Sequence, residues 1–286
     1  MTIGHPAPKT KAALLAAAVL CLPNPAQAGP ADTYYERAFM VAADQRCGLF
    51  ETRIDAALGA ATAQARGAAL RSGAAEADLS ATAARARSRA QAVSCRDPQL
   101  ATVKGRVDNA FSGWLRTPRM TFPGTRANWT ANRLGSTGPA WHLRQASVVG
   151  ASPVAFGYAG EGDAPGLVAV VSFVGRSRPN AARIVLRDPQ RVARAWLAGD
   201  GLVPASSRAS LWAAGVAVAD PALLAEGRTA GETWRFPAST AAALERLDPR
   251  ETFAIEFHFR DGSVATAKFE AGDFAAGRAF LAMGML

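Results

Sequence analysis

Residues 252–270 read TFAIEFHFRDGSVATAKFE, and this stretch decides the class of the fold. Its first eight residues place large apolar side chains on one face and Glu256 and His258 on the other. Such a period of two is typical of a strand that buries one face. Asp261-Gly262 follows, and this dipeptide between alternating runs predicts a tight hairpin turn. We therefore expect a β-hairpin whose second strand is 263–270. The apolar residues of its first strand are Phe253, Ile255, Phe257 and Phe259.

The chain before this hairpin is also strand-like from about residue 121 onward. Glycine and proline become frequent there and separate short apolar runs. A short helix is predicted over 241–247 with Thr240 as its N-cap, and a last helix over 274–283 with Asp273 as its N-cap. Residues 121–286 are therefore predicted to form a β-sandwich-like domain with a C-terminal helix. Its other predicted strands are 127–132, 141–149, 154–158, 167–174, 182–186, 210–218 and 233–236.

Residues 29–120 have a different pattern, rich in alanine, with apolar residues three and four positions apart. This spacing is typical of amphipathic helices. Asp97 before Pro98 is a typical helix start. The four predicted helices are 31–45, 51–70, 75–93 and 98–117. We therefore expect an α+β protein in which an Ala-rich four-helix bundle precedes the β-sandwich-like domain.

Two cysteines, Cys47 and Cys95, lie after the first 28 residues of the chain. Cys47 lies between the first and second predicted helices, and Cys95 lies between the third and fourth. In an up-down-up-down bundle these two junctions lie at the same end. The spacing therefore predicts a Cys47–Cys95 disulfide, whereas a redox-active thiol is disfavoured because the chain has no Cys-x-x-Cys motif.

Residues 1–28 have the features of a signal peptide. Lys9 and Lys11 precede an apolar run over 12–22, and Ala26-Gln27-Ala28 fits a cleavage site before Gly29. A lipoprotein signal around Cys21 is disfavoured by the preceding Leu20. The apolar run is too short to span a membrane, and no later run is long enough. We expect a periplasmic or secreted protein without a transmembrane segment.

The net charge of +9 comes from 32 basic and 23 acidic residues, and +7 remains once Lys9 and Lys11 are removed. This excess favours anionic partners such as glycans, lipid headgroups or acidic proteins. Export and the absence of a nucleic-acid-binding motif argue against nucleic acid. The residues predicted to bind such a partner are Arg85 and Arg89 on one face of the third helix, with Arg66 and Arg71 on or just after the second. A solvated helix face is the alternative interpretation.

Two histidines, His142 and His258, remain after the signal peptide. This number excludes zinc sites built on several histidines. The metalloprotease, phosphate-loop, EF-hand and G-x-S-x-G motifs are all missing, so we expect neither a metal nor another cofactor. The alternative is a hydrolase in which His142 or His258 is the catalytic base. Its other catalytic residues would come from distant parts of the chain.

The segment 241–281 resembles the C-terminal part of the invasion-associated locus B family. The similar features are Ala242-Ala243-Leu244, the strands around Phe257 and Phe269, and the run Gly272-Asp273-Phe274-Ala275-Ala276. The paired cysteines of that domain are missing here, and the helical segment has no counterpart. The resemblance implies a periplasmic β-sandwich-like module that is not an enzyme.

Together these features predict an exported, periplasmic, non-catalytic binding or structural protein, an interaction module of the cell envelope. A periplasmic hydrolase with a site in the β domain and a carrier of a small ligand are the alternatives.

Overall fold

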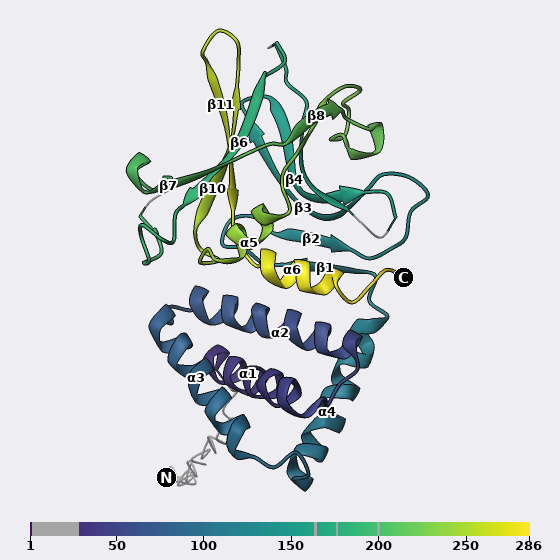
Figure 1. Cartoon of the computed structure of the whole chain (residues 1–286), viewed down its shortest axis with the longest axis vertical. Coiled ribbons are helices and arrows are strands. Elements are labelled where there is room, and N and C mark those ends of the chain that lie inside the picture. Colours follow the sequence, from purple (N-terminus) through teal and green to yellow (C-terminus); the bar gives the residue numbers. More distant parts are fainter. Residues whose placement is uncertain (2–28, 163–164, 176, 199–200) are drawn as a thin grey trace.

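The computed structural model describes residue 1 and residues 29–162, 165–175, 177–198 and 201–286. The predicted signal peptide, apart from Met1, lies outside the described residues. The chain is an α+β protein with four N-terminal helices, two antiparallel sheets and a C-terminal helix (Figure 1). The first four helices are α1 (Pro30–Cys47), α2 (Thr52–Arg71), α3 (Glu76–Ala92) and α4 (Pro98–Leu115).

A seven-stranded and a four-stranded sheet form the β part. The larger sheet has the order β1 (Arg119–Phe122), β2 (Trp129–Asn132), β3 (Ala140–Val149), β4 (Ser152–Gly160), β5 (Gly166–Val171), β9 (Glu232–Arg235) and β8 (Gly215–Val218). The smaller sheet has the order β11 (Val264–Glu270), β10 (Thr252–His258), β6 (Ala181–Arg187) and β7 (Arg208–Trp212). The sheets share a core, because the ring of Phe156 in β4 lies 5.5 Å from Phe253 and 5.7 Å from Phe269 in the smaller sheet.

The hairpin at 252–270 is confirmed. Strands β10 and β11 pair in register from Thr252–Glu270 to His258–Val264. Phe253, Ile255 and Phe257 are fully buried, as the alternation predicted. On the other face, Glu256 lies opposite Arg183 of β6, and their side chains form an ion pair of 2.7 Å.

The structure corrects three details of the sequence analysis. The strand predicted over 210–218 is two strands, because the chain crosses at Ala213-Ala214 from the smaller sheet to the larger one. The helix predicted from 241 begins earlier, as α5 (Ser239–Glu245) with Ala238 as N-cap, so Thr240 is a buried helical residue rather than a cap. Strand β1 was not predicted, although its residues RMTF alternate polar and apolar side chains, because it follows directly on the predicted end of the fourth helix.

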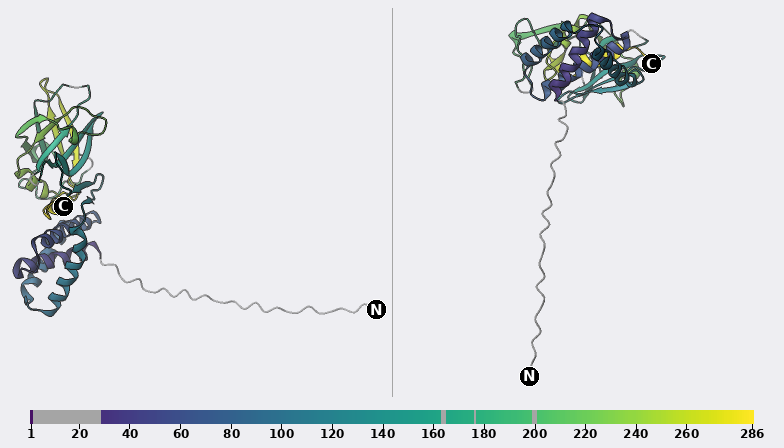
Figure 2. Two further views of the ribbon diagram at one scale, coloured as in Figure 1. Left: turned by 90° about the vertical axis from the view of Figure 1, so that its right-hand side faces the viewer. Right: turned by 90° about the horizontal axis from the view of Figure 1, so that it is seen from below.

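The Cys47–Cys95 disulfide is confirmed, with the two Cα atoms 5.6 Å apart. It joins the end of α1 to the α3–α4 connection, so these two junctions lie at one end of the helical part, as predicted. The arrangement is more open than a regular bundle: α1 packs against α2 and α3, and Figure 1 shows α3 and α4 diverging on either side of α1. Figure 2 shows the helical part stacked end to end with the β part.

Helix α6 (Phe274–Leu281) lies between the two parts and packs on α2 and on β1, β2 and β3. Buried side chains form one continuous cluster from α1 and α2 through α6 to both sheets. The helices end at Leu115 and the strands begin at Arg119, close to the predicted boundary. Because the core is continuous, the division into two domains at residue 120 stays a prediction.

Asp273 stands at the N-cap position of α6, but its carboxylate does not cap the helix. It accepts two hydrogen bonds from Arg71 of α2, from Nη1 at 2.7 Å and Nη2 at 2.9 Å. Burial raises the pKa of the Asp273 carboxyl, and the Arg71 guanidinium opposes that rise. Gly67 lets the two helices approach, because a Cβ there would lie 2.0 Å from Oδ1 of Asp273.

This contact predicts opposite effects for two glycines of α2. Gly67→Ala is expected to lower the free energy of unfolding by about 1–3 kcal/mol, because the new methyl group displaces Asp273 from Arg71. Gly59→Ala is the matched control, because a Cβ there meets nothing within 4 Å. It is expected to raise the free energy of unfolding by about 0.5–1 kcal/mol, since alanine is the better helix former. Urea denaturation measures both values, and a stabilised Gly67→Ala variant contradicts the proposed packing.

Arg133, directly after β2, is fully buried and joins three segments of the chain. Its Nε donates to the carbonyl of Gly284 at 2.6 Å, and its Nη1 donates to the carbonyls of Trp114 at 3.1 Å and Thr117 at 3.3 Å. The guanidinium also lies over the ring of Phe280 in α6, 5.1 Å from its centroid. One side chain thus ties the end of α4 to the C-terminal residues.

Candidate functional site

The four arginines predicted to bind an anion do not meet in one site. Arg85 and Arg89 lie on the exposed face of α3, where Nη2 of Arg85 donates to Oγ1 of Thr82 at 2.8 Å. Arg66 is paired with Glu76 at the start of α3. The guanidinium of Arg71 forms an ion pair with the carboxylate of Asp273. Anion binding by Arg85 and Arg89 stays a prediction.

His258, one of the two predicted bases, lies on the outer face of the smaller sheet. Its Nε2 is 3.6 Å from Oε2 of Glu256, and its ring lies 5.4 Å from that of Trp212. Arg183 also belongs to this group. It forms the ion pair with Glu256, and its guanidinium carbon lies over the Trp212 ring, 5.3 Å from the ring centroid. The contacts of His258 are therefore with neighbours on its own sheet.

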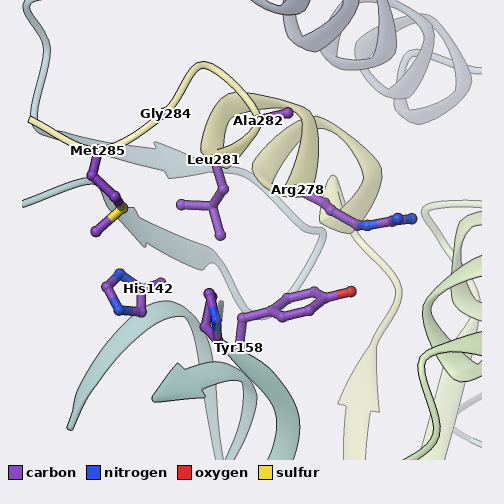
Figure 3. A pocket seen from close by; sticks show the side chains of 8 residues that line it. His142, Tyr158, Arg278, Leu281, Ala282, Gly284 and Met285 are labelled. Atoms are coloured by element: carbon purple, nitrogen blue, oxygen red, sulfur yellow. The ribbon is translucent and has the colours of Figure 1, made fainter. Parts of the chain in front are cut away.

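His142 lies in the wall of a cavity of about 660 Å³ between the larger sheet and α6. Figure 3 shows its imidazole beside Met285, with Leu281 pointing into the space between His142 and Tyr158. The described lining comes from β3, β4, the β4–β5 connection, α6 and the residues after it. It consists of His142, Tyr158, Pro165, Arg278, Leu281, Ala282, Gly284 and Met285.

A β-bulge places His142 in this wall. The pairing of β3 with β4 runs from Trp141–Ala159 directly to Leu143–Tyr158, so His142 is the extra residue of β3. Such a bulge redirects a side chain and is frequent beside functional sites. Here both His142 and the following Leu143 are buried, so the alternation of the strand is broken at this point.

The imidazole of His142 leaves one hydrogen bond unmade. Its Nδ1 lies 3.3 Å from the carbonyl oxygen of Asn132, and a carbonyl only accepts, so Nδ1 carries the hydrogen. Its Nε2 is buried and has no partner, although the residue is only 1% exposed. An unpaired buried polar atom is costly and requires an explanation. A hydroxyl or another donor would satisfy Nε2, and because this atom is buried, the wall of the cavity must move to admit such a group from a ligand.

The other polar groups of the cavity are Tyr158 and Arg278, whose side chains extend to the same side in Figure 3. Burial raises the pKa of the Tyr158 hydroxyl, and the effect of the Arg278 charge is smaller and opposite. The hydroxyl is therefore a donor at neutral pH. Arg278 is paired with Glu245 at 2.7 Å, but 43% of its side chain remains exposed. This end of the cavity thus offers a cation and a hydroxyl donor.

The described lining contains no serine, threonine, cysteine or carboxylate. A hydrolytic site that uses His142 as base would need a nucleophile or a water-activating partner in reach. The lining instead combines apolar side chains with a few convergent polar groups, which is typical of a binding site for a small molecule.

His142 is identifiable from the sequence, whereas the residues that surround it are not. Tyr158 is far in sequence from His142's other neighbours Arg278 and Met285, and no motif connects these residues. The described residues contain no group of three or more His, Cys, Asp or Glu side chains that could hold a metal ion. None of the described helices is long and apolar enough to cross a membrane.

Comparison with known proteins finds no matching family model, no matching curated protein and no matching solved structure. The resemblance of 241–281 to the invasion-associated locus B family therefore stays a prediction.

Proposed function

We propose that this chain is an exported, periplasmic, non-catalytic binding protein whose ligand is a small amphipathic molecule. The observation that carries the proposal is the unpartnered Nε2 of His142, buried in the wall of a cavity. The N-terminal pattern and the disulfide support export, because disulfides persist in oxidising compartments. The family resemblance supports an envelope location without catalysis.

The lining suggests the chemistry of the ligand. Leu281, Met285 and Pro165 suit an apolar body. Arg278 and Tyr158 suit a carboxylate, which pairs with a guanidinium and accepts from a phenol. Nε2 of His142 suits a hydroxyl group as donor. A hydroxylated medium-chain carboxylic acid combines these three features.

The test compares 10-hydroxydecanoate with decanoate by isothermal titration calorimetry. The wild-type protein is expected to bind 10-hydroxydecanoate about three- to tenfold more tightly, which corresponds to one additional hydrogen bond. His142→Leu is expected to abolish this preference, because it removes the acceptor. His258→Leu, which changes the other histidine on the outer sheet face, is expected to preserve it.

Circular dichroism and urea denaturation establish that each variant is folded before titration. Equal affinity of the wild-type protein for the two acids would refute the role of His142. Failure of both acids to bind would refute the proposed ligand class.

A further inference from the structure

A second cavity, of about 440 Å³, lies between the helical part and the β part. In Figure 1 the turn between α2 and α3 lies at the left, below the loop that joins β6 to β7. Residues of this turn, of that loop and of the segment after α5 line the cavity. We refer to it as the arginine cleft, because five arginines line it: Arg66, Arg187, Arg194, Arg246 and Arg250.

Three of these arginines are held by carboxylates. Arg187 donates to both oxygens of Glu251, from Nε at 2.6 Å and Nη2 at 2.9 Å. Arg250 donates to both oxygens of Asp248, each at 2.9 Å. Arg66 is paired with Glu76 across the α2–α3 turn. These pairs fix the positions of three guanidinium groups and neutralise their charges.

The other two, Arg194 and Arg246, are exposed and unpaired. Neither makes a hydrogen bond or ion pair with any residue that the structure describes. The five guanidinium groups carry five positive charges, and the carboxylates of Glu76, Asp248 and Glu251 carry three negative charges. The local net charge is therefore +2. Two free guanidinium groups that line a cleft are a typical arrangement for oxyanion binding.

We propose that the arginine cleft binds a phosphoryl group, with Arg194 and Arg246 as its ligands. A phosphate monoester carries close to two negative charges at neutral pH, which matches the local excess. The cleft has room for a small organic group beside the phosphate. This site is separate from the His142 cavity, and of the four arginines predicted from the sequence it contains only Arg66.

A ligand in the cleft would contact both parts of the molecule. Arg194 and Arg246 belong to the β part, whereas Arg66 and Glu76 belong to the helical part. Binding to the folded state alone raises stability. A phosphoryl ligand is therefore expected to raise the unfolding temperature of the whole chain.

The test uses glycerol 3-phosphate as probe and glycerol as the uncharged control, by calorimetry and thermal unfolding. The wild-type protein is expected to bind glycerol 3-phosphate but not glycerol. The double variant Arg194→Gln/Arg246→Gln is expected to lose at least about tenfold in affinity, because it loses two charge-assisted contacts.

Arg85→Gln/Arg89→Gln is the matched control, because it removes the same charge from the exposed face of α3. It is expected to change the affinity by less than about twofold, apart from a general electrostatic effect. An equal loss in both double variants would overturn the proposal in favour of non-specific attraction. A loss only in the α3 variant would locate the site on the face predicted from the sequence, and no binding by the wild-type protein would also overturn it.

Co-sedimentation with vesicles distinguishes two sources of the phosphoryl group. Phosphatidic acid presents a phosphate monoester at a membrane surface, and phosphatidylcholine vesicles provide the control. Vesicle binding that depends on Arg194 and Arg246 would indicate a lipid headgroup. Binding of soluble glycerol 3-phosphate without vesicle binding would indicate a soluble phosphate ester.

Discussion

Replacing Arg187 with methionine is expected to lower the free energy of unfolding by about 3–5 kcal/mol, since it leaves a buried carboxylate without its counter-ion. The side chains of Arg187 and Glu251 are only 5% and 2% exposed. Glu251 also accepts hydrogen bonds from the backbone N–H groups of Trp196 at 3.0 Å and Asp248 at 2.8 Å. The pair thus fixes the loop after β6 against the segment before β10.

A second substitution isolates the charge in this effect. Glu251→Gln in the Arg187→Met background neutralises the buried group and keeps an oxygen for the backbone donors. We expect it to recover about 1–3 kcal/mol of the loss, as measured by urea denaturation. Lys104→Met breaks an exposed pair with Asp108 and serves as the control, with an expected loss below about 0.5 kcal/mol. A loss of that small size for Arg187→Met would show that the pair contributes little.

Removing the disulfide with Cys47→Ala/Cys95→Ala is expected to cost about 4 kcal/mol in the chain-entropy model. The cross-link joins residues 48 positions apart, and its loss gives the unfolded chain more conformations. Cys95 is exposed, so its truncation removes little packing. Most of the change therefore reflects the cross-link itself.

Urea denaturation with and without dithiothreitol checks this value. The wild-type protein under reducing conditions is expected to unfold at nearly the same urea concentration as the double variant. The double variant itself is expected to be insensitive to the reductant. If reduction leaves the midpoint of the wild-type protein unchanged, the disulfide does not stabilise the helical part.

Elements with a strong local period could be predicted from the sequence. The four helices and the hairpin at 252–270 lie close to their expected positions, because each has a long, regular pattern. The crossing at Ala213-Ala214 could not be predicted, since neither residue is typical of a turn. A run of apolar residues there is compatible with one long strand or with two.

The candidate site was predictable only in part. His142 was identified because histidines are few, but its neighbours come from two other stretches of the chain, 158–165 and 278–285. The bulge that turns it inward depends on the pairing of β3 with β4, which no single strand reveals. The arginine cleft has the same origin, because Arg66 and Arg246 are far apart in sequence and the fold brings them to one cavity.

The hydrogen bonds of Arg133 have a consequence for the time course of folding. Its partner Gly284 lies 151 positions further along the chain. The contacts of helices α1 to α4 with one another join residues that are closer in sequence than Arg133 and Gly284 are, and more local contacts form faster. The contact of Arg133 with Gly284 must instead wait until the intervening strands are in place, because closing so long a loop is entropically unfavourable. We therefore expect the helical part to become ordered early and its attachment to the strands to be among the last events of refolding.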